Sequence, residues 1–178
     1  LTRMKVECIV VSDTRFGSGG FTLIELMLTL ALVAIVLGFG VPSMTQLIRS
    51  NQVINQTNSV LGGIQLARAE AVKRGVGMAV CGSSDQASCD GQWGQGWLVY
   101  EDSDGSGSPT STNIVRVADG SAEVDNTSGG VVRFDHQGLR RDTSEATVTI
   151  KRSACGSEKA RQISIARGGR AASEKVSC

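Results

Sequence analysis

A long apolar segment near the N-terminus constrains this chain more than any other feature. No charged residue occurs between Leu26 and Ile48, and the apolar stretch from Phe21 to Val41 is interrupted only by Glu25 and small polar residues. A stretch of this length is sufficient to cross a bilayer as a helix. The sequence therefore predicts one membrane-spanning helix over residues 21–48.

The charges before this segment predict its orientation. Lys5 and Arg15 precede it, and basic residues close to a membrane span stay on the cytoplasmic side. A cleavable secretory signal is the alternative, but the apolar run is too long for the core of such a signal, and no small-x-small site closes it. We therefore expect residues 49–178 to lie outside the cytoplasm.

Glu25 separates this segment from a plain membrane anchor. A carboxylate in hydrocarbon costs about 3 kcal/mol on insertion scales, so it needs a partner or a function. Residues 19–26 read Gly-Gly-Phe-Thr-Leu-Ile-Glu-Leu. This run resembles the class III prepilin junction, a glycine followed by Phe-Thr-Leu-Ile-Glu, and Pro42 falls where pilins commonly carry a proline.

The resemblance implies how the chain would be processed and assembled. Prepilin peptidase would cleave after Gly20 and methylate the new amino group of Phe21, so residues 1–20 would form a leader. In the family, the glutamate attracts the N-terminal amine of a neighbouring subunit, which would give Glu25 a cationic partner in the filament. Three segments are therefore expected: the leader at 1–20, the transmembrane and assembly helix at 21–48, and a periplasmic globular domain at 49–178.

The helical pattern continues beyond the membrane segment. Gly75 follows two basic residues, which is typical of a helix end. We predict one helix from Phe21 to about Arg74, with a kink rather than a break near Pro42. The apolar positions that recur at helical spacing after the proline are Leu47, Ile54, Leu61, Ile64, Ala67 and Ala71.

Short strands separated by turn-rich segments are predicted after Gly75. They are rich in β-branched or aromatic residues and bounded by Gly, Ser, Asp or Asn. No helix alternates with them, so the fold class is α+β, with an antiparallel sheet packed on the long helix. The predicted strands are Met78–Cys81, Trp97–Glu101, Ile114–Ala118, Val131–Asp135, Ala146–Arg152 and Gln162–Ala166.

Three stretches of the globular part are similar to the GspH/FimT family of minor pilins. Residues 65–74 resemble the end of that family's helix, residues 94–100 its tryptophan-containing strand, and residues 161–170 its last strand and the following Gly-Arg turn. The resemblance implies a type IV pilin-like fold, in which two β-sheets surround the C-terminal half of the helix.

The cysteines predict disulfides. Cys8 lies in the expected leader, which leaves an even set in a compartment that would be oxidising. Proximity in the sequence favours pairing Cys81 with Cys89 and Cys155 with Cys178, and the other two connectivities remain open.

The sequence offers no parts for catalysis. His136 is the only histidine, no Ser-His-Asp or Cys-His set is supported, and bridged cysteines leave no thiolate or zinc ligand. Residues 102–107 faintly resemble a calcium loop, but Asn113 stands where a bidentate glutamate is expected, so we interpret them as a hairpin turn. We predict no enzyme activity, no metal and no cofactor.

Charge is unevenly distributed along the chain. Residues 84–137 carry nine acidic and two basic residues, whereas residues 138–178 carry nine basic and four acidic ones. A basic surface could bind DNA phosphates without sequence preference. The alternative, a solvated surface with interspersed charges, is favoured because of the motif described next.

Some members of the GspH/FimT family are DNA receptors that use a Gly-Arg-x-Arg turn. The matching positions here begin with Gly169 and Arg170, and alanine replaces the second arginine. Arg167, just before the turn, is a possible substitute. The DNA hypothesis therefore requires Arg167 and Arg170 to converge with Arg140 or Arg141.

The function predicted from these observations is that of a minor pilin in the tip or priming complex of a type IV pilus. Its expected partners are other major and minor pilins, prepilin peptidase and the bacterial inner membrane. One alternative is a DNA-binding minor pilin for natural transformation. The other is a minor pseudopilin of a type II secretion system, which would share the N-terminus and the fold.

Overall fold

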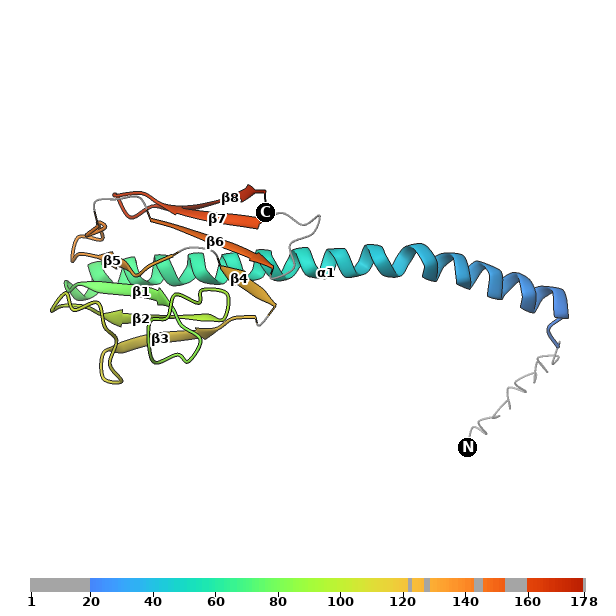
Figure 1. Cartoon of the computed structure of the whole chain (residues 1–178), viewed down its shortest axis with the longest axis horizontal. Coiled ribbons are helices and arrows are strands. Elements are labelled where there is room, and N and C mark those ends of the chain that lie inside the picture. Colours follow the sequence, from blue (N-terminus) through green and yellow to red (C-terminus); the bar gives the residue numbers. More distant parts are fainter. Residues whose placement is uncertain (1–19, 122, 127–128, 143–145, 153–159, 178) are drawn as a thin grey trace, which may run out of the picture. The chain divides into compact units, whose positions relative to one another are not determined.

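The computed structural model describes residues 20–121, 123–126, 129–142, 146–152 and 160–177 (Figure 1). The predicted helix is confirmed as α1, Leu23–Arg74, which continues through Pro42. It begins after Thr22, whose Oγ1 accepts a hydrogen bond from the backbone N–H of Glu25 at 3.3 Å, as an N-cap does. The chain divides into two compact units at Pro42, and the second unit contains every strand that the structure describes.

The strands form two four-stranded antiparallel sheets. The first has the order β3-β2-β1-β5 and the second the order β4-β6-β7-β8. The strands are β1 (Met78–Gly82), β2 (Gly96–Glu101), β3 (Ile114–Asp119), β4 (Val124–Asn126), β5 (Val132–Phe134), β6 (Ala146–Arg152), β7 (Ala160–Ile165) and β8 (Ala171–Val176).

The six predicted strands are present, β6 with the predicted ends and the other five with ends shifted by one or two residues, but two further strands were not predicted. β4 has only three residues and one buried apolar side chain, Val124. β8 is built from small and charged residues, and it forms because its backbone pairs with β7 from Ala171 to Val176. Neither strand carries the β-branched enrichment that makes a strand visible in a sequence.

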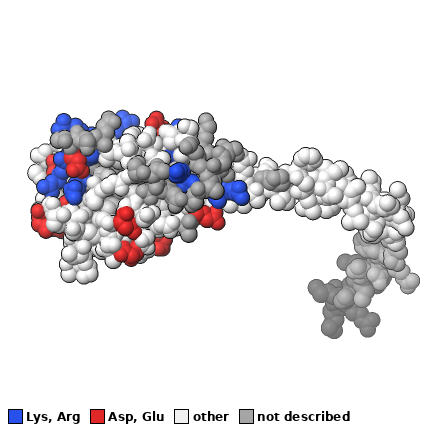
Figure 2. Space-filling model, viewed as in Figure 1, with Lys and Arg blue, Asp and Glu red and all other residues white. Residues whose placement is uncertain are grey.

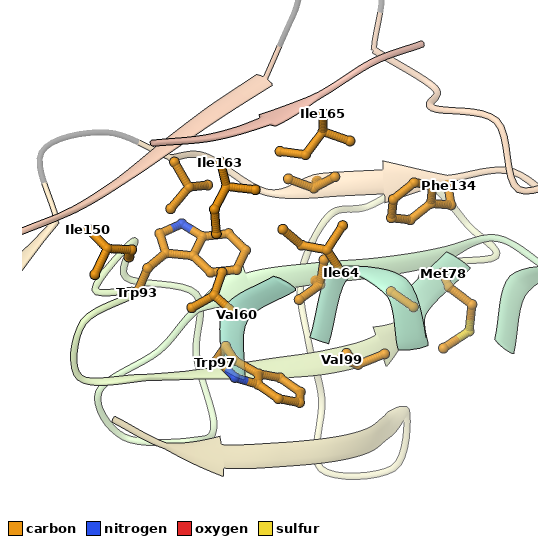
Figure 3. Close-up of a cluster of buried hydrophobic side chains, with 14 of the residues drawn as sticks. Val60, Ile64, Met78, Trp93, Trp97, Val99, Phe134, Ile150, Ile163 and Ile165 are labelled. Carbon is orange, nitrogen blue, oxygen red and sulfur yellow. The ribbon is translucent and has the colours of Figure 1, made fainter. Parts of the chain in front are cut away.

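The core lies between α1 and the two sheets (Figure 3). One face of α1 is buried at helical spacing, and Ile64 on that face packs in the same cluster as side chains from both sheets. Fully burying one such side chain contributes about 1.5–3 kcal/mol. The buried helix residues are Val53, Val60, Ile64, Ala67 and Ala71, and the largest strand and loop residues around them are Trp93, Trp97, Phe134, Ile150, Ile163 and Ile165.

Two tryptophans connect α1 to the loops and strands around it. Trp97 lies so close to α1 that a Cβ added at Gly63 would be 2.8 Å from Trp97 Cδ2. Its indole Nε1 donates a hydrogen bond to Ser59 Oγ at 2.9 Å. Trp93 accepts a hydrogen bond on its carbonyl from Gln56 Nε2 at 2.8 Å. Buried polar groups are therefore paired where the helix meets the sheets.

Candidate functional site

The first half of α1 is an apolar surface. Among the described residues, α1 is the one helix that is long and apolar enough to cross a membrane, and none of its most apolar window is buried. The large apolar side chains from Phe21 to Ile48 are between 50% and 80% exposed. By length and composition, this segment therefore fits a membrane span.

The residues expected to act in processing and assembly lie at the start of this surface. The Phe21 side chain is 80% exposed, and Glu25 is exposed one turn further on. Within the part of the chain that the structure describes, the Glu25 carboxylate forms no ion pair. A Cβ added at Gly20 would meet nothing within 4 Å. None of these three residues is thus needed for packing inside the described chain.

The expected disulfide between Cys81 and Cys89 is present, and the Cα atoms of the two residues are 5.6 Å apart. It ties the end of β1 to the following loop. Cys8, Cys155 and Cys178 lie outside the described residues, and so does the second expected pair.

Asp85 organises the disulfide loop through hydrogen bonds. Its Oδ1 accepts from the backbone N–H groups of Ala87 at 2.9 Å and Ser88 at 2.8 Å. The Ser88 hydroxyl adds a third bond, to Oδ2, at 2.7 Å. These donors stabilise the charged form, so they hold the pKa of Asp85 well below its usual range.

The turn between β7 and β8 presents two exposed arginines. Arg167 and Arg170 flank Gly168 and Gly169, and the backbone N–H of Ala166 donates to the carbonyl of Arg170 at 2.9 Å. Gly169 has φ 76°, a left-handed conformation that favours glycine. The turn closes on this glycine, which leaves both arginine side chains in solvent.

The structure brings Arg140 next to this turn but buries its side chain. The Arg140 backbone N–H donates to the carbonyl of Arg167 at 3.0 Å, whereas its Nη1 donates to the carbonyl of Ile165 at 2.8 Å. Only 7% of Arg140 is exposed. Arg140 is therefore not part of an exposed basic surface, because β7 provides an acceptor inside the domain, and Arg141 is the other residue that the DNA hypothesis named.

Arg141 remains partly exposed, with its Nη1 3.9 Å from Asp102 Oδ2. Figure 2 shows Lys and Arg gathered at the end of the domain where α1 ends, with a few acidic residues among them. Arg141, Arg167 and Arg170 are thus the accessible members of the predicted basic set.

The loop after β2 is held by charge pairs. Asp102 is buried, its Oδ2 lies 3.3 Å from Arg133 Nε, and its Oδ1 accepts from the backbone N–H of Gly107 at 2.8 Å. Within the described ranges, no group of three or more His, Cys, Asp or Glu side chains could hold a metal ion. His136 lies exposed in the turn after β5.

Tyr100 is the other buried titratable group in this sheet. Burial raises the pKa of Tyr100 to about 12, so its hydroxyl stays protonated at neutral pH. Tyr100 is fully buried in the first sheet and belongs to its core.

Comparisons with known proteins agree on both parts of the chain. A family model described as type II transport protein GspH matches residues 56–169. A model of the prokaryotic N-terminal methylation motif matches residues 15–41. A search of curated proteins finds no significant match.

Two solved structures are similar to this fold, and both are crystal structures of the type IV minor pilin FimU from Pseudomonas aeruginosa strain PAO1. The form in space group P21 has a TM-score of 0.53 and 20% identity, and covers 70% of this chain and 89% of that one. The form in space group P65 has a TM-score of 0.51 and 19% identity, with coverage of 67% and 90%. At this identity the likeness concerns the fold.

Proposed function

We propose that this chain, which belongs to the GspH family of type II transport proteins and resembles the minor pilin FimU in fold, is itself a minor pilin, a structural subunit in the tip or priming complex of a type IV pilus. It would be held in the inner membrane by α1, with its globular domain in the periplasm, until it is assembled with other major and minor pilins. The observation that carries this proposal is the exposed apolar half of α1 with Glu25 inside it.

The apolar half of α1 needs partners from other molecules. Each Leu, Ile or Phe side chain left in water forgoes about 1.5–3 kcal/mol of burial, so this surface favours lipid tails or the helices of other subunits. Lipid satisfies the apolar side chains but not the Glu25 carboxylate. A filament core that offers the amine of a neighbouring Phe21 would satisfy both, which favours transfer from membrane to filament.

Processing would create that amine. We propose that prepilin peptidase cleaves after Gly20 and that Phe21 is then methylated, as the match to the methylation motif supports. Since an added Cβ at Gly20 would meet nothing within 4 Å, packing does not explain this glycine. A requirement for close approach at the peptidase site does explain it.

The assembly role is tested by Glu25→Ala. The variant should insert into the membrane normally and be lost from sheared filaments, because it removes the charge but no packing. Thr29→Ala is the matched control, since the Thr29 hydroxyl donates only to the Leu26 carbonyl of its own helix. Filaments that contain Glu25→Ala at the level of the control would contradict the proposal.

The cleavage site is tested by Gly20→Val. We expect a precursor heavier by the leader in blots of membrane fractions, with Gly40→Ala as a control that is processed normally. Mass spectrometry of the chain without this substitution should find a methylated amino group on Phe21. A Gly20→Val chain processed as usual would overturn the assignment.

A type II secretion pseudopilin is the alternative with the same N-terminus and fold, and the name of the matching family favours it. Deleting the gene separates the two. Loss of pili with normal secretion supports the pilus role, whereas loss of secretion with normal pili supports the pseudopilin.

DNA binding is a second candidate function, favoured by the two exposed arginines of the β7–β8 turn. The logarithm of the DNA-binding constant should fall linearly with the logarithm of the salt concentration. The double variant Arg167→Ala, Arg170→Ala should reduce the magnitude of this slope by about 2, since each phosphate contact contributes about 1. Arg116→Ala on β3 is the control, because Arg116 is also exposed but lies in the acidic part of the chain. An equal effect of the control would indicate net charge rather than a site.

A further inference from the structure

β5 belongs to the first sheet and β6 to the second, so the chain passes from one sheet to the other between these two strands. β4 pairs with β6 only at Ile150–Arg152, whereas β7 pairs with the other edge of β6 down to Ala146. β5 is the outer strand of the first sheet. Among the described residues, no strand pairs with the edge of β6 at 146–149, and we call the space between this edge and residues 129–133 the fork.

This fork contains a cleft of about 340 Å³. Residues 129–133 form one wall, residues 146–148 form the other, and Arg140 and Asp142 complete the lining. The fork closes at Gly129, where an added Cβ would lie 3.0 Å from Val148 Cγ2. Arg133 and Asp142 in the lining are partly exposed.

Arg140 is a buried cation in this cleft with little to neutralise it. Its Nη1 donates to the Ile165 carbonyl, but its Nε has no hydrogen-bond partner among the described residues. No described carboxylate lies within ion-pair distance of it. Burying a guanidinium without a counter-charge is costly, so this arrangement calls for an anion.

Arg133 shows the contrast within the same cleft. It lies 3.3 Å from Asp102 Oδ2 and 3.8 Å from Asp142 Oδ1, so its charge is compensated. Arg140 is also held in place, because its backbone N–H donates to the Arg167 carbonyl and it bridges to Phe134. The uncompensated guanidinium is therefore preorganised for a ligand.

We propose that this fork binds an extended peptide segment of another polypeptide, with a carboxylate of that segment on Arg140. A carboxylate matches the planar guanidinium, and the unpaired edge of β6 offers backbone groups for strand addition. The phosphates of duplex DNA would instead meet the exposed Arg167 and Arg170 on the surface. This site goes beyond the assembly role, which rests on the exposed first half of α1 and on Glu25.

The test uses the full chain in a neutral detergent and two acetylated, amidated pentapeptides, Val-Thr-Glu-Thr-Val and Val-Thr-Gln-Thr-Val. Isothermal titration should find the glutamate peptide bound about tenfold tighter or more, because only it supplies the counter-charge. Arg140→Gln should bring the two affinities within about twofold of each other. Arg167→Ala removes the same charge outside the cleft and should keep the full preference.

A second variant separates binding from folding, since Arg140→Gln also removes the hydrogen bond to Ile165. Gly130 lines the cleft, and an added Cβ there would meet nothing within 4 Å, so Gly130→Val should fold and narrow the cleft. It should weaken the glutamate peptide about tenfold. The proposal is overturned if neither peptide binds, if the glutamate preference survives Arg140→Gln, or if inorganic phosphate or a DNA duplex displaces the peptide at lower concentration.

Discussion

The two halves of α1 have the same backbone structure and opposite surroundings. From Phe21 to Ile48 every large apolar side chain is at least half exposed, whereas Val60 and Ile64 in the second half are fully buried. The second half gains its stability from sheets of its own chain. The first half has to gain it from lipid or from other subunits. One helix therefore makes contacts within the chain in its second half and contacts with other molecules in its first half. Substitutions in the second half should change the stability of the domain, whereas those in the first half should not.

The sharpest test of this division is a pair of truncations, Ile64→Ala and Leu32→Ala. Ile64→Ala leaves a cavity in the core and should lower the free energy of unfolding of the domain by about 3–4 kcal/mol. Leu32→Ala removes a similar side chain from the exposed half and should leave that free energy unchanged. Denaturation in detergent, followed by fluorescence of the buried Trp93 and Trp97, measures both. Equal losses would mean that the two halves are not independent.

The disulfide should contribute somewhat less. Cys81 and Cys89 are eight positions apart, and closing a loop of this length restricts the unfolded chain by about 2.5 kcal/mol in the chain-entropy account. Replacing both with alanine should lower the free energy of unfolding of the domain by that amount without changing membrane insertion. A double variant as stable as the parent would show that Asp85 and its hydrogen bonds hold the loop alone.

A smaller effect is expected at Ser59, whose hydroxyl accepts the hydrogen bond from Trp97 Nε1. Ser59→Ala leaves this indole N–H without its partner and should cost about 1 kcal/mol. Ser43→Ala, on the exposed stretch of the same helix, is the control and should have no effect on unfolding. If the control destabilised the domain as much, helix propensity rather than the contact would explain the loss.

The smallest effect concerns pH. The pKa of Asp85 is lowered by hydrogen bonds to its charged form, so its contribution to stability is present above the unfolded pKa near 4 and is lost as pH falls through the folded value. Stability should therefore decrease on acidification below about pH 4, and less so in Asp85→Asn. Denaturation midpoints at neutral and acidic pH measure this. If Asp85→Asn lost as much stability on acidification as the parent chain, the loss would come from other carboxylates.

Several features were predictable because they depend on neighbouring residues. The long helix followed from an unbroken apolar run and the helical spacing of residues such as Ile64 and Ala71, and the family followed from the junction around Gly20 and Glu25. The six strands with β-branched residues were visible for the same reason. These patterns are local, so no knowledge of distant contacts was required.

Other features were decided only when distant segments met. β8 exists because β7 offers an edge, and the division into two sheets arises because β5 pairs with β1 whereas β6 pairs with β4 and β7. The sequence by itself determined that Arg140 is a cation in a basic end of the chain, but only the folded structure turned it inward. The reason is physical: charge and periodicity are properties of single residues and their neighbours, whereas burial and pairing depend on which remote surfaces the chain brings together.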